Sequence, residues 1–331
     1  MEREQTIIMK KQPKIIGSYT IVGPKEGLGN FGPYFDYVMK NDYFGEETYE
    51  KAERKMLETA ISGVIEKAKI TSKSVDIMIA GDLLNQIISS SYAARAFEFP
   101  YIGVYGACST MAESMAVGAT LIDGGYCKKV LCCTGSHFST AERQYRFPLE
   151  LGNQRPPTSQ WTVTGAGACI LSMEGDGPKI SSVTFGKVVD WGINDVNDMG
   201  AAMAVAVRDT LLNHLKNTKT KVTDYDLIVT GDLGKLGSEI LVDLMDEEGV
   251  CLGLNYCDCG QMYYKKSQQT LCGGSGAGCC ATVFNSYIMQ KFRDGQYKKV
   301  LFMPTGALLS TTSSQQVETV HGVCHEIMIE R

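Results

Sequence analysis

One pattern occurs twice in this chain and limits the folds that are open to it. Residues 76–83 read DIMIAGDL and residues 226–233 read DLIVTGDL, so an aspartate, four mostly apolar residues and Gly-Asp-Leu recur 150 positions apart. Residues 125–131 (GYCKKVL) are echoed in the same order by residues 295–301 (GQYKKVL), 170 positions later. Matched landmarks in one order indicate two copies of a single supersecondary plan, with insertions of different length.

Within each copy, short apolar runs bounded by glycine or aspartate alternate with stretches of helical period. This alternation is typical of parallel strands covered by helices, and it predicts an α/β fold. In the first copy we expect strands at 15–22, 75–81, 101–105 and 129–134, helices at 47–69, 88–97 and 108–124, and a hairpin around 166–189. In the second copy we expect helices at 199–217, 237–248 and 277–293, and strands at 226–231, 299–303 and around 320–329.

The 331 residues are enough for two halves of ordinary domain size. We place the boundary near Gly175–Pro178, which gives an N-terminal half at 1–176 and a C-terminal half at 177–331. Each half carries one insertion, a polar one at 136–160 and one rich in Cys, Tyr and Gln at 255–274. Long irregular insertions on a rigid scaffold often carry function, so we expect the functional site to involve them.

The charge pattern argues against some classes of function. The 32 basic and 37 acidic residues are interspersed and give a net charge of −5, whereas nucleic-acid binding depends on clustered Lys and Arg. No apolar run approaches the roughly 20 residues of a bilayer span. The charged start of the chain also lacks the apolar core of a secretory signal. We therefore expect no nucleic-acid partner, no transmembrane segment and no signal peptide, and any membrane role would come through a partner protein.

Twelve cysteines occur in the chain, several of them inside apolar runs, which predicts reduced thiols that behave as small apolar side chains. A zinc site among Cys257, Cys259, Cys272 and Cys279–Cys280 is disfavoured because no paired C-x-x-C spacing is present. Cys108 is placed differently, at a turn from a strand into a helix. A helix N-terminus favours a thiolate, so Cys108 could be nucleophilic, or it could be a small residue packed at a tight turn.

The duplicated plan and the turn at 106–110 (GACST) resemble the thiolase and ketoacyl synthase superfamily. Over nearly the whole chain, a more specific resemblance is to the family of stage V sporulation protein AD of spore-forming Firmicutes. Five motifs carry it in order: 80–86 (AGDLLNQ), 106–110 (GACST), 141–148 (AERQYRFP), 189–193 (VDWGI) and 305–310 (TGALLS). The closing segment at 321–323 (HGV) fits as well.

This resemblance implies a thiolase-like fold, with two duplicated βαβαβ-type halves that form a layered α-β-α-β-α sandwich. It implies a noncatalytic protein that binds dipicolinic acid, alone or as its calcium chelate. Such a protein takes part in uptake into the developing spore and release at germination, together with other SpoVA membrane proteins. It also implies a homodimer that pairs through residues 99–105, and a forespore or spore protein peripherally associated with the inner spore membrane.

Condensing enzymes of this superfamily use a His and a further His or Asn beside the cysteine. The matching loop at 230–234 contains no His, and the later glycine-rich turn at 272–277 contains no Asn. We therefore expect no enzyme activity, no catalytic residue and no cofactor, with Cys108 as a vestigial nucleophile. Two alternatives stay open: an acyl-transferring or condensing enzyme that uses Cys108 with His321, and a structural adaptor with a vestigial pocket.

A planar dianion such as dipicolinate needs donors for two carboxylates and a flat wall. The candidate ligand-binding residues are Cys108, His137, Arg143, Arg146, His321 and Asp82. The two arginines could instead pair with Glu142 and Glu150 or lie in the dimer interface, and Asp82 and Asp232 could be helix caps. Of the remaining histidines, His214 is expected at the surface and His325 in a structural role. No calcium loop of the EF-hand kind and no other metal site is expected.

Overall fold

Each half of the chain builds the same elements in the same order. The computed structural model describes residues 4–145, 152 and 154–331. The first half provides β2 (Lys14–Val22), α2 (Tyr49–Lys67), β4 (Ile77–Asp82), α3 (Ile88–Ala96), β5 (Tyr101–Gly103), α4 (Thr110–Asp123), β6 (Lys129–Ser136) and β8 (Gly165–Ser172). The second half provides β9 (Lys179–Thr184), α6 (Met199–Thr218), β11 (Leu227–Thr230), α7 (Gly234–Glu247), β12 (Tyr256–Asp258), α9 (Ala277–Val283), α10 (Met289–Arg293), β14 (Lys299–Met303) and β17 (Glu326–Glu330).

Smaller elements decorate this repeat. Near the N-terminus they are β1 (Thr6–Ile8), α1 (Pro24–Gly27) and β3 (Tyr37–Val38). Around the functional end of the sheet they are α5 (Phe138–Tyr145), β7 (Trp161–Thr162), β10 (Val189–Ile193), α8 (Cys259–Tyr263), β13 (Gly274–Ser275), β15 (Thr305–Leu308), α11 (Thr311–Gln315) and β16 (Val320–Cys324). A single π-helical turn, Phe284–Ile288, joins α9 to α10.

The strand order is the same in the two halves. The first half runs β5-β4-β6-β8-β2 and the second runs β12-β11-β14-β17-β9, so that in both the order is third, second, fourth, fifth and first along the chain. In both, the first three strands of this path are parallel and the remaining pairs are antiparallel. The halves join where β2 meets β9, through the residue pair Lys14–Lys179.

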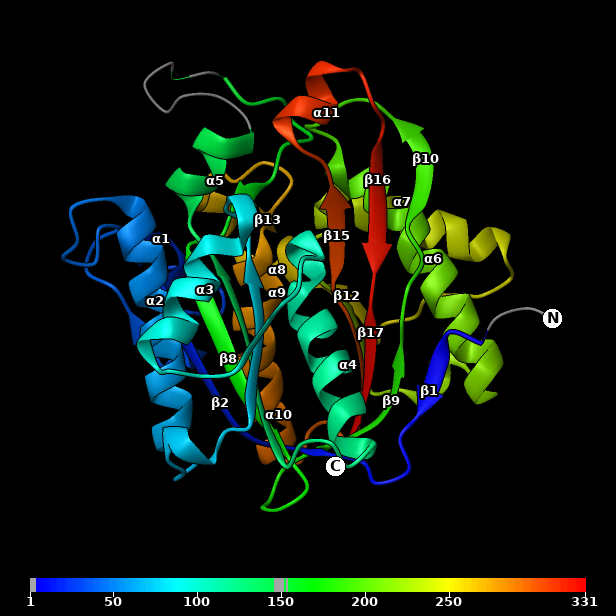
Figure 1. Ribbon diagram of the computed structural model, residues 1–331. Helices are drawn as coiled ribbons and strands as arrows, with labels where there is room; N and C mark the ends of the chain where they lie inside the picture. Colours follow the sequence, from blue (N-terminus) through cyan, green and yellow to red (C-terminus); the bar gives the residue numbers. More distant parts are fainter. Residues whose placement is uncertain (1–3, 146–151, 153) are drawn as a thin grey trace.

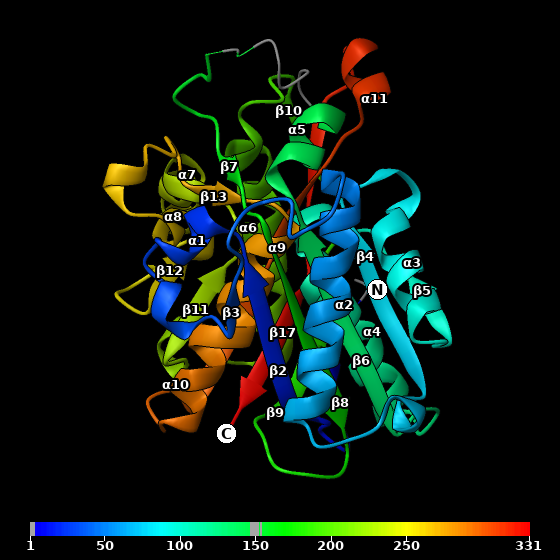
Figure 2. The same ribbon diagram turned by 90° about the vertical axis from the view of Figure 1, so that its left-hand side faces the viewer.

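The halves of the sheet are covered by helices on both sides, and alternate residues of each strand face different cores. Ile79, Val229 and Phe302 face a central core with α4 and α9, which lie between the halves (Figure 1). Met78 and Leu131 face an outer core under α2 and α3 (Figure 2), and the third core lies under α6 and α7. This is the expected α-β-α-β-α layering. In the part of the chain that the structure describes, no helix is both long and apolar enough to cross a membrane.

Most predicted helices and strands are present, but the predicted hairpin and the predicted single closing strand are wrong. The segment 166–189 does not form a hairpin, because β2 lies between β8 and β9 and pairs with both. The closing segment 320–329 is two strands in two sheets, β16 between β10 and β15 and β17 between β14 and β9. The break falls at His325, whose Nδ1 accepts a hydrogen bond of 3.3 Å from the amide of Gly186. The alternation of apolar and polar residues continues through this break, so the sequence pattern does not reveal where one strand ends and the next begins.

The segment 255–274 is only partly an insertion. It begins with β12, which pairs in parallel with β11 and occupies the place that β5 has in the first half. The three residues Tyr-Cys-Asp are too short and too polar to be recognised as a strand from the sequence. The extra material therefore starts at α8, beyond the third strand of the repeat.

His214 is not at the surface, as the helical pattern suggested, but fully buried. Its Nε2 lies 2.6 Å from the hydroxyl of Tyr225, and its Nδ1 lies 2.8 Å from the carboxylate of Glu326. These contacts connect α6 to β17. In the sequence of an amphipathic helix, polar residues that form a buried network cannot be told apart from polar residues that face the solvent.

Candidate functional site

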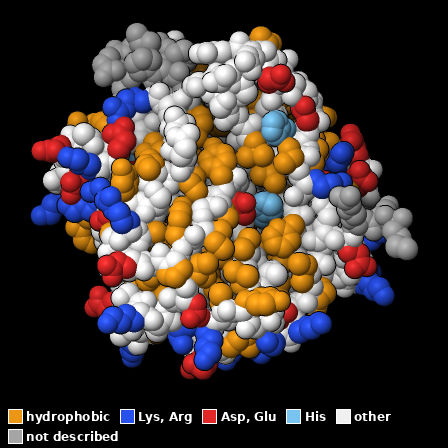
Figure 3. Space-filling view, in the orientation of Figure 1, with side chains coloured by type: hydrophobic (Ala, Val, Ile, Leu, Met, Phe, Trp, Pro, Cys, Tyr) orange, Lys and Arg blue, Asp and Glu red, His pale blue; other side chains and the backbone are white. Residues whose placement is uncertain are grey.

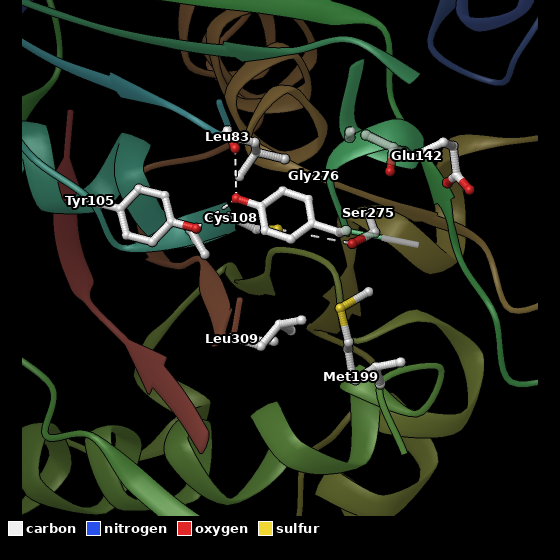
Figure 4. A pocket seen from close by; sticks show the side chains of 14 residues that line it. Leu83, Tyr105, Cys108, Glu142, Met199, Ser275, Gly276 and Leu309 are labelled. Carbon is white, nitrogen blue, oxygen red and sulfur yellow. Dashed lines mark hydrogen bonds between the residues drawn. The ribbon is translucent and has the colours of Figure 1, made fainter. Parts of the chain in front are cut away.

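The two insertions predicted to carry function meet at one short parallel ladder. In it, β13 pairs with β7, with Gly274 opposite Trp161 and Ser275 opposite Thr162. The ladder continues into the flanking chain, where the Trp161 amide donates to the Gly273 carbonyl and the Val163 amide to the Ser275 carbonyl, both at 2.8 Å. Thr162 and Ser275 line a cavity beside Cys108 (Figure 4).

Cys108 lies in a 3₁₀ turn, Ala107–Ser109, directly before α4. The preceding Ala107 has a φ of +50°, a left-handed conformation that is strained for a residue with a side chain. On the other side of the turn, a Cβ at Gly306 would lie 2.0 Å from the Gly106 carbonyl oxygen, so β15 can pass this closely only with glycine there. The turn is therefore held firmly, and Cys108 is only 8% exposed.

Asp232 is the centre of the polar groups beside Cys108. The Ser275 hydroxyl donates to Asp232 Oδ2 at 3.0 Å, and the Thr305 hydroxyl donates to Oδ1 at 2.7 Å. The Cys108 thiol lies close to this carboxyl group and interacts with it electrostatically. Asp232 is fully buried, and burial raises its pKa to about 7. The carboxyl group is therefore partly protonated near neutral pH.

The surroundings of Cys108 favour the neutral thiol. Burial raises its pKa well above the usual range, and the adjacent Asp232 carboxylate raises it further. The thiolate that a helix N-terminus would favour is thus opposed by two larger effects. Its other polar neighbour is the Ser275 hydroxyl, 3.9 Å from the sulfur. A condensing enzyme needs a base and an oxyanion donor beside its cysteine. In this structure the polar side chains beside Cys108 are Asp232 and Ser275.

The rest of the cavity wall is mostly apolar. The hydroxyls of Tyr105 and Tyr145 lie 2.9 Å apart, and Tyr145 also donates to the Leu83 carbonyl at 2.6 Å (Figure 4). The apolar lining residues are Leu83, Ala107, Ala141, Val196, Met199, Ala307 and Leu309. This inner cavity has a volume of about 50 Å³, enough for a few water molecules. An outer cavity of about 350 Å³ shares Tyr105, Tyr145 and Leu309 with it.

Of the five predicted residues that the structure describes, Cys108 alone lines the cavity. Asp82 is buried and accepts hydrogen bonds from the amides of Leu84 and Ser90, so it acts as a helix cap for α3. His137 is also buried, directly after the end of β6, and its Nε2 lies 2.8 Å from the Asp42 carbonyl oxygen. Both side chains are engaged in local structure.

The remaining predicted ligands lie farther out. Arg143 forms an ion pair with Glu50, not with Glu142, which pairs with Arg155 at 2.6 Å. Arg146 lies outside the described residues. His321 is on β16, opposite Asp190 of β10, and is not among the residues that line the cavity. The structure therefore does not bring the predicted set together into one site.

Sequence reasoning missed the side chains that surround the cysteine. The sequence suggested a helix cap for Asp232, but that capping role belongs to Asp258, which accepts hydrogen bonds from the amides of Leu233 and Gly234. The repeat itself held the signal, since Asp232 occupies the position of Asp82 in the second copy. Ser275 had no such signal. Among residues 4–145, 152 and 154–331, no group of three or more His, Cys, Asp or Glu side chains is placed to hold a metal.

Comparison with known proteins identifies both a family and a fold. The family model described as stage V sporulation protein AD matches residues 3–330. The chain is 42% identical to "Stage V sporulation protein AD" of Bacillus subtilis (strain 168) over 328 residues, which cover 99% of this chain and 97% of the relative.

Solved structures of condensing enzymes match in fold. The 3-oxoacyl-[acyl-carrier-protein] synthase III from Aquifex aeolicus VF5 has a TM-score of 0.61 and 12% identity, covering 96% of this chain and 100% of the other. The cerulenin-bound OleA of Xanthomonas campestri, a co-crystal, has a TM-score of 0.63 and 12% identity, covering 100% of both chains. These matches confirm the predicted thiolase-like α/β fold.

We expect the Asp232→Asn variant to become more stable relative to the wild-type protein as the pH rises. Folding raises the pKa of Asp232 from 3.8 to about 7. The folded protein therefore holds this proton more tightly than the unfolded chain, and that stabilisation is lost as the pH rises from about 3.8 to about 7. The difference in unfolding free energy should shift in favour of the variant by about 3 kcal/mol between about pH 5 and about pH 9.

Urea denaturation at several pH values measures this difference. The exposed Asp246→Asn substitution on α7 is the matched control and should give a difference that does not change with pH. A constant difference for Asp232→Asn as well would mean that this carboxyl group is ionised throughout.

Proposed function

Because the chain belongs to the stage V sporulation protein AD family, and is thus a sporulation protein, we propose that it is a noncatalytic thiolase-fold protein that binds dipicolinic acid. The observation that carries this proposal is the environment of Cys108. The cavity beside the cysteine is kept, whereas burial of the thiol and the adjacent Asp232 carboxylate raise the pKa of Cys108 and hold the thiol neutral. A cavity without an activated nucleophile is suited to binding a ligand and releasing it unchanged.

The charge of the cavity favours the calcium chelate over the free dianion. Glu142, which is paired with Arg155, lines the cavity, and the buried Asp232 adjoins it. No Lys or Arg among the described lining residues would compensate the charge of a free dicarboxylate, and burying an unpaired charge is costly. One calcium ion and one dipicolinate together carry no net charge, so the chelate avoids this cost. Calcium then enters with the ligand and needs no resident site.

The ligand is proposed to bind where the inner and outer cavities meet. The inner cavity alone is too small for a pyridine ring with two carboxylates, but Tyr105, Tyr145 and Leu309 border both cavities. The two tyrosine rings offer a flat wall, and their hydroxyls, with those of Thr162 and Ser275, are its neutral polar groups. Binding then requires the contact between Tyr105 and Tyr145 to open.

The role that fits such a binding protein is carriage of dipicolinate during uptake into the developing spore and release at germination. Since no described helix could cross a membrane, the protein would act at the inner spore membrane through the other SpoVA proteins. The competing proposal is that the protein is only a structural adaptor for its membrane partners and that its cavity binds no ligand. It requires that cavity substitutions leave ligand content and binding unchanged.

We expect calorimetric titration with dipicolinate to show saturable binding that is stronger with calcium than without it. The Leu309→Trp variant should abolish it, because a larger side chain at this position fills the junction of the two cavities. Leu254→Trp, at a fully exposed position, is the matched control and should bind like the wild type. Absence of binding at millimolar ligand in the wild-type protein would exclude the receptor role and favour the adaptor.

Labelling with iodoacetamide at neutral pH separates binding from acyl chemistry. We expect the exposed Cys251 to react at least about tenfold faster than Cys108, because Cys108 is buried and its pKa is raised. Asp232→Asn should speed the labelling of Cys108, since it removes the negative charge that opposes the thiolate. Mass spectrometry of the peptides gives both rates. Labelling of Cys108 as fast as Cys251 would support the acyl-transferring alternative.

We also propose that the protein is a homodimer that pairs along β5. This strand lies at the edge of the sheet, beside α3 (Figure 2), and its outward N–H and C=O groups can pair with another strand. Ile102 and Tyr105 are 38% and 40% exposed. Apolar side chains also gather in the middle of the face on which α4 lies (Figures 1 and 3).

Analytical ultracentrifugation tests the dimer. The wild-type protein should sediment as a dimer, and Ile102→Lys should sediment as a monomer because it places a charge in the interface. Leu28→Lys, at a position that is 68% exposed on a different element, should remain dimeric. A wild-type monomer at micromolar concentration would overturn the proposal.

A further inference from the structure

A second, larger hollow lies on the other side of the β7–β13 ladder. Its volume is about 920 Å³, and its wall comes from residues 154–155, Lys235 at the start of α7, Gln261 of α8 and the chain at 264–273. We call it the basic groove, after Arg155, Lys235, Lys265 and Lys266, which line it. None of these residues lines the cavity beside Cys108. Cys272 and Gly273 border the groove, and Ser275 and Gly276 border the cavity, so the two hollows are neighbours.

The charge of the basic groove is of one sign. Four cationic side chains from three segments line it, and no Asp or Glu is among its described lining residues. The chain as a whole carries a net charge of −5, so this local excess is not a general property of the surface. Lys235 lies in the first turn of α7, where the helix dipole disfavours a cation. A bound anion would relieve both the mutual repulsion of the cations and this unfavourable position.

Arg155 is held in place as part of the wall. Its Nη2 pairs with Glu142 at 2.6 Å, and its Nη1 donates to the Gln160 carbonyl at 3.0 Å. The guanidinium lies 5.2 Å and 5.0 Å from the ring centroids of Phe138 and Trp161, which stack on each other. An anion that approaches from the groove therefore meets a guanidinium whose position is already fixed.

The floor of the groove is rigid. The Lys235 amide donates to the Cys272 carbonyl at 2.8 Å, and the Cys272 amide donates to the Ser159 carbonyl at 3.1 Å. The amides of Leu233 and Gly234, at the N-terminus of α7, are bonded to Asp258. These main-chain donors are occupied, so an anion in the groove would be bound by side chains. The Gln261 and Gln269 amides and the Thr270 hydroxyl add neutral donors to the cations.

We propose that the basic groove is a binding site for a small polyanion with two or more closely spaced oxyanion groups. The ligand is held by the Lys235, Lys265 and Lys266 ammonium groups and the Arg155 guanidinium. This site is distinct from the cavity beside Cys108 and does not depend on what that cavity binds. Phosphate and carboxylate groups share the chemistry that such a site recognises.

Calorimetric titration with pyrophosphate, at low ionic strength, tests the site. Wild-type protein should bind one equivalent, and the affinity should fall as salt is added. The double variant Lys235→Gln, Lys266→Gln should bind at least about tenfold more weakly, because two charge-assisted contacts are lost. Lys73→Gln, Lys128→Gln removes the same charge from exposed positions outside the groove and should leave the affinity unchanged.

Citrate titration and the Leu309→Trp variant decide how the site is interpreted. Citrate that binds with the same dependence on Lys235 and Lys266 extends the site to polycarboxylates, whereas citrate that does not bind restricts it to phosphates. Leu309→Trp, which fills the other site, should bind pyrophosphate like the wild type. No saturable binding of pyrophosphate or citrate, equal weakening in the control double variant, or loss of pyrophosphate binding in Leu309→Trp would each overturn the proposal. Thermal unfolding of every variant checks that it is folded.

Discussion

The burial of the Asp232 carboxyl group is the constraint on which the candidate site depends. The group lies at the end of β11 with no solvent access, and it is satisfied by hydroxyls that come from β13 and β15. These bonds hold together three segments that are distant in sequence, and they do so beside the Cys108 turn. The same carboxyl group raises the pKa of the Cys108 thiol. One buried acid thus both assembles the cavity and keeps the cysteine neutral.

The duplication explains how an aspartate came to be there. Gly-Asp ends β4 in the first copy and directly follows β11 in the second, and in the first copy Asp82 caps α3 through its bonds to the amides of Leu84 and Ser90. In the second copy Asp258, at the end of β12, caps α7 and α8. Asp232 is thereby released from capping and can face Cys108. Equivalent residues in a repeat can therefore have different roles. The role depends on which side chain accepts hydrogen bonds from the free amides at the start of the following helix.

The repeat and the period of the apolar residues were sufficient to predict the fold class and most helices and strands. They could not predict pairings that depend on chain crossings, such as β2 between β8 and β9 or the change of sheet at His325. The position of Cys108 was predictable from its turn, but its partners were not. Only the folded chain brings Ser275 and Tyr145 to the same cavity as Cys108. Two predicted ligands have local partners instead: Arg143 is paired with the Glu50 carboxylate, and His137 is hydrogen-bonded to the Asp42 carbonyl oxygen.

The two hollows beside the β7–β13 ladder differ in electrostatics, and this difference constrains what each can hold. The cavity at Cys108 adjoins Asp232 and has no described cation in its wall, which favours a ligand that is neutral overall or brings its own cation. The basic groove is lined by four cationic side chains, of which Arg155 is paired with Glu142, and by no described acid, which favours an anion. Added calcium should therefore affect the two sites in opposite directions. Calcium neutralises the charge of a dicarboxylate and so favours its binding in the cavity. In the groove, calcium competes with the lysine ammonium groups for the oxyanion and so weakens its binding.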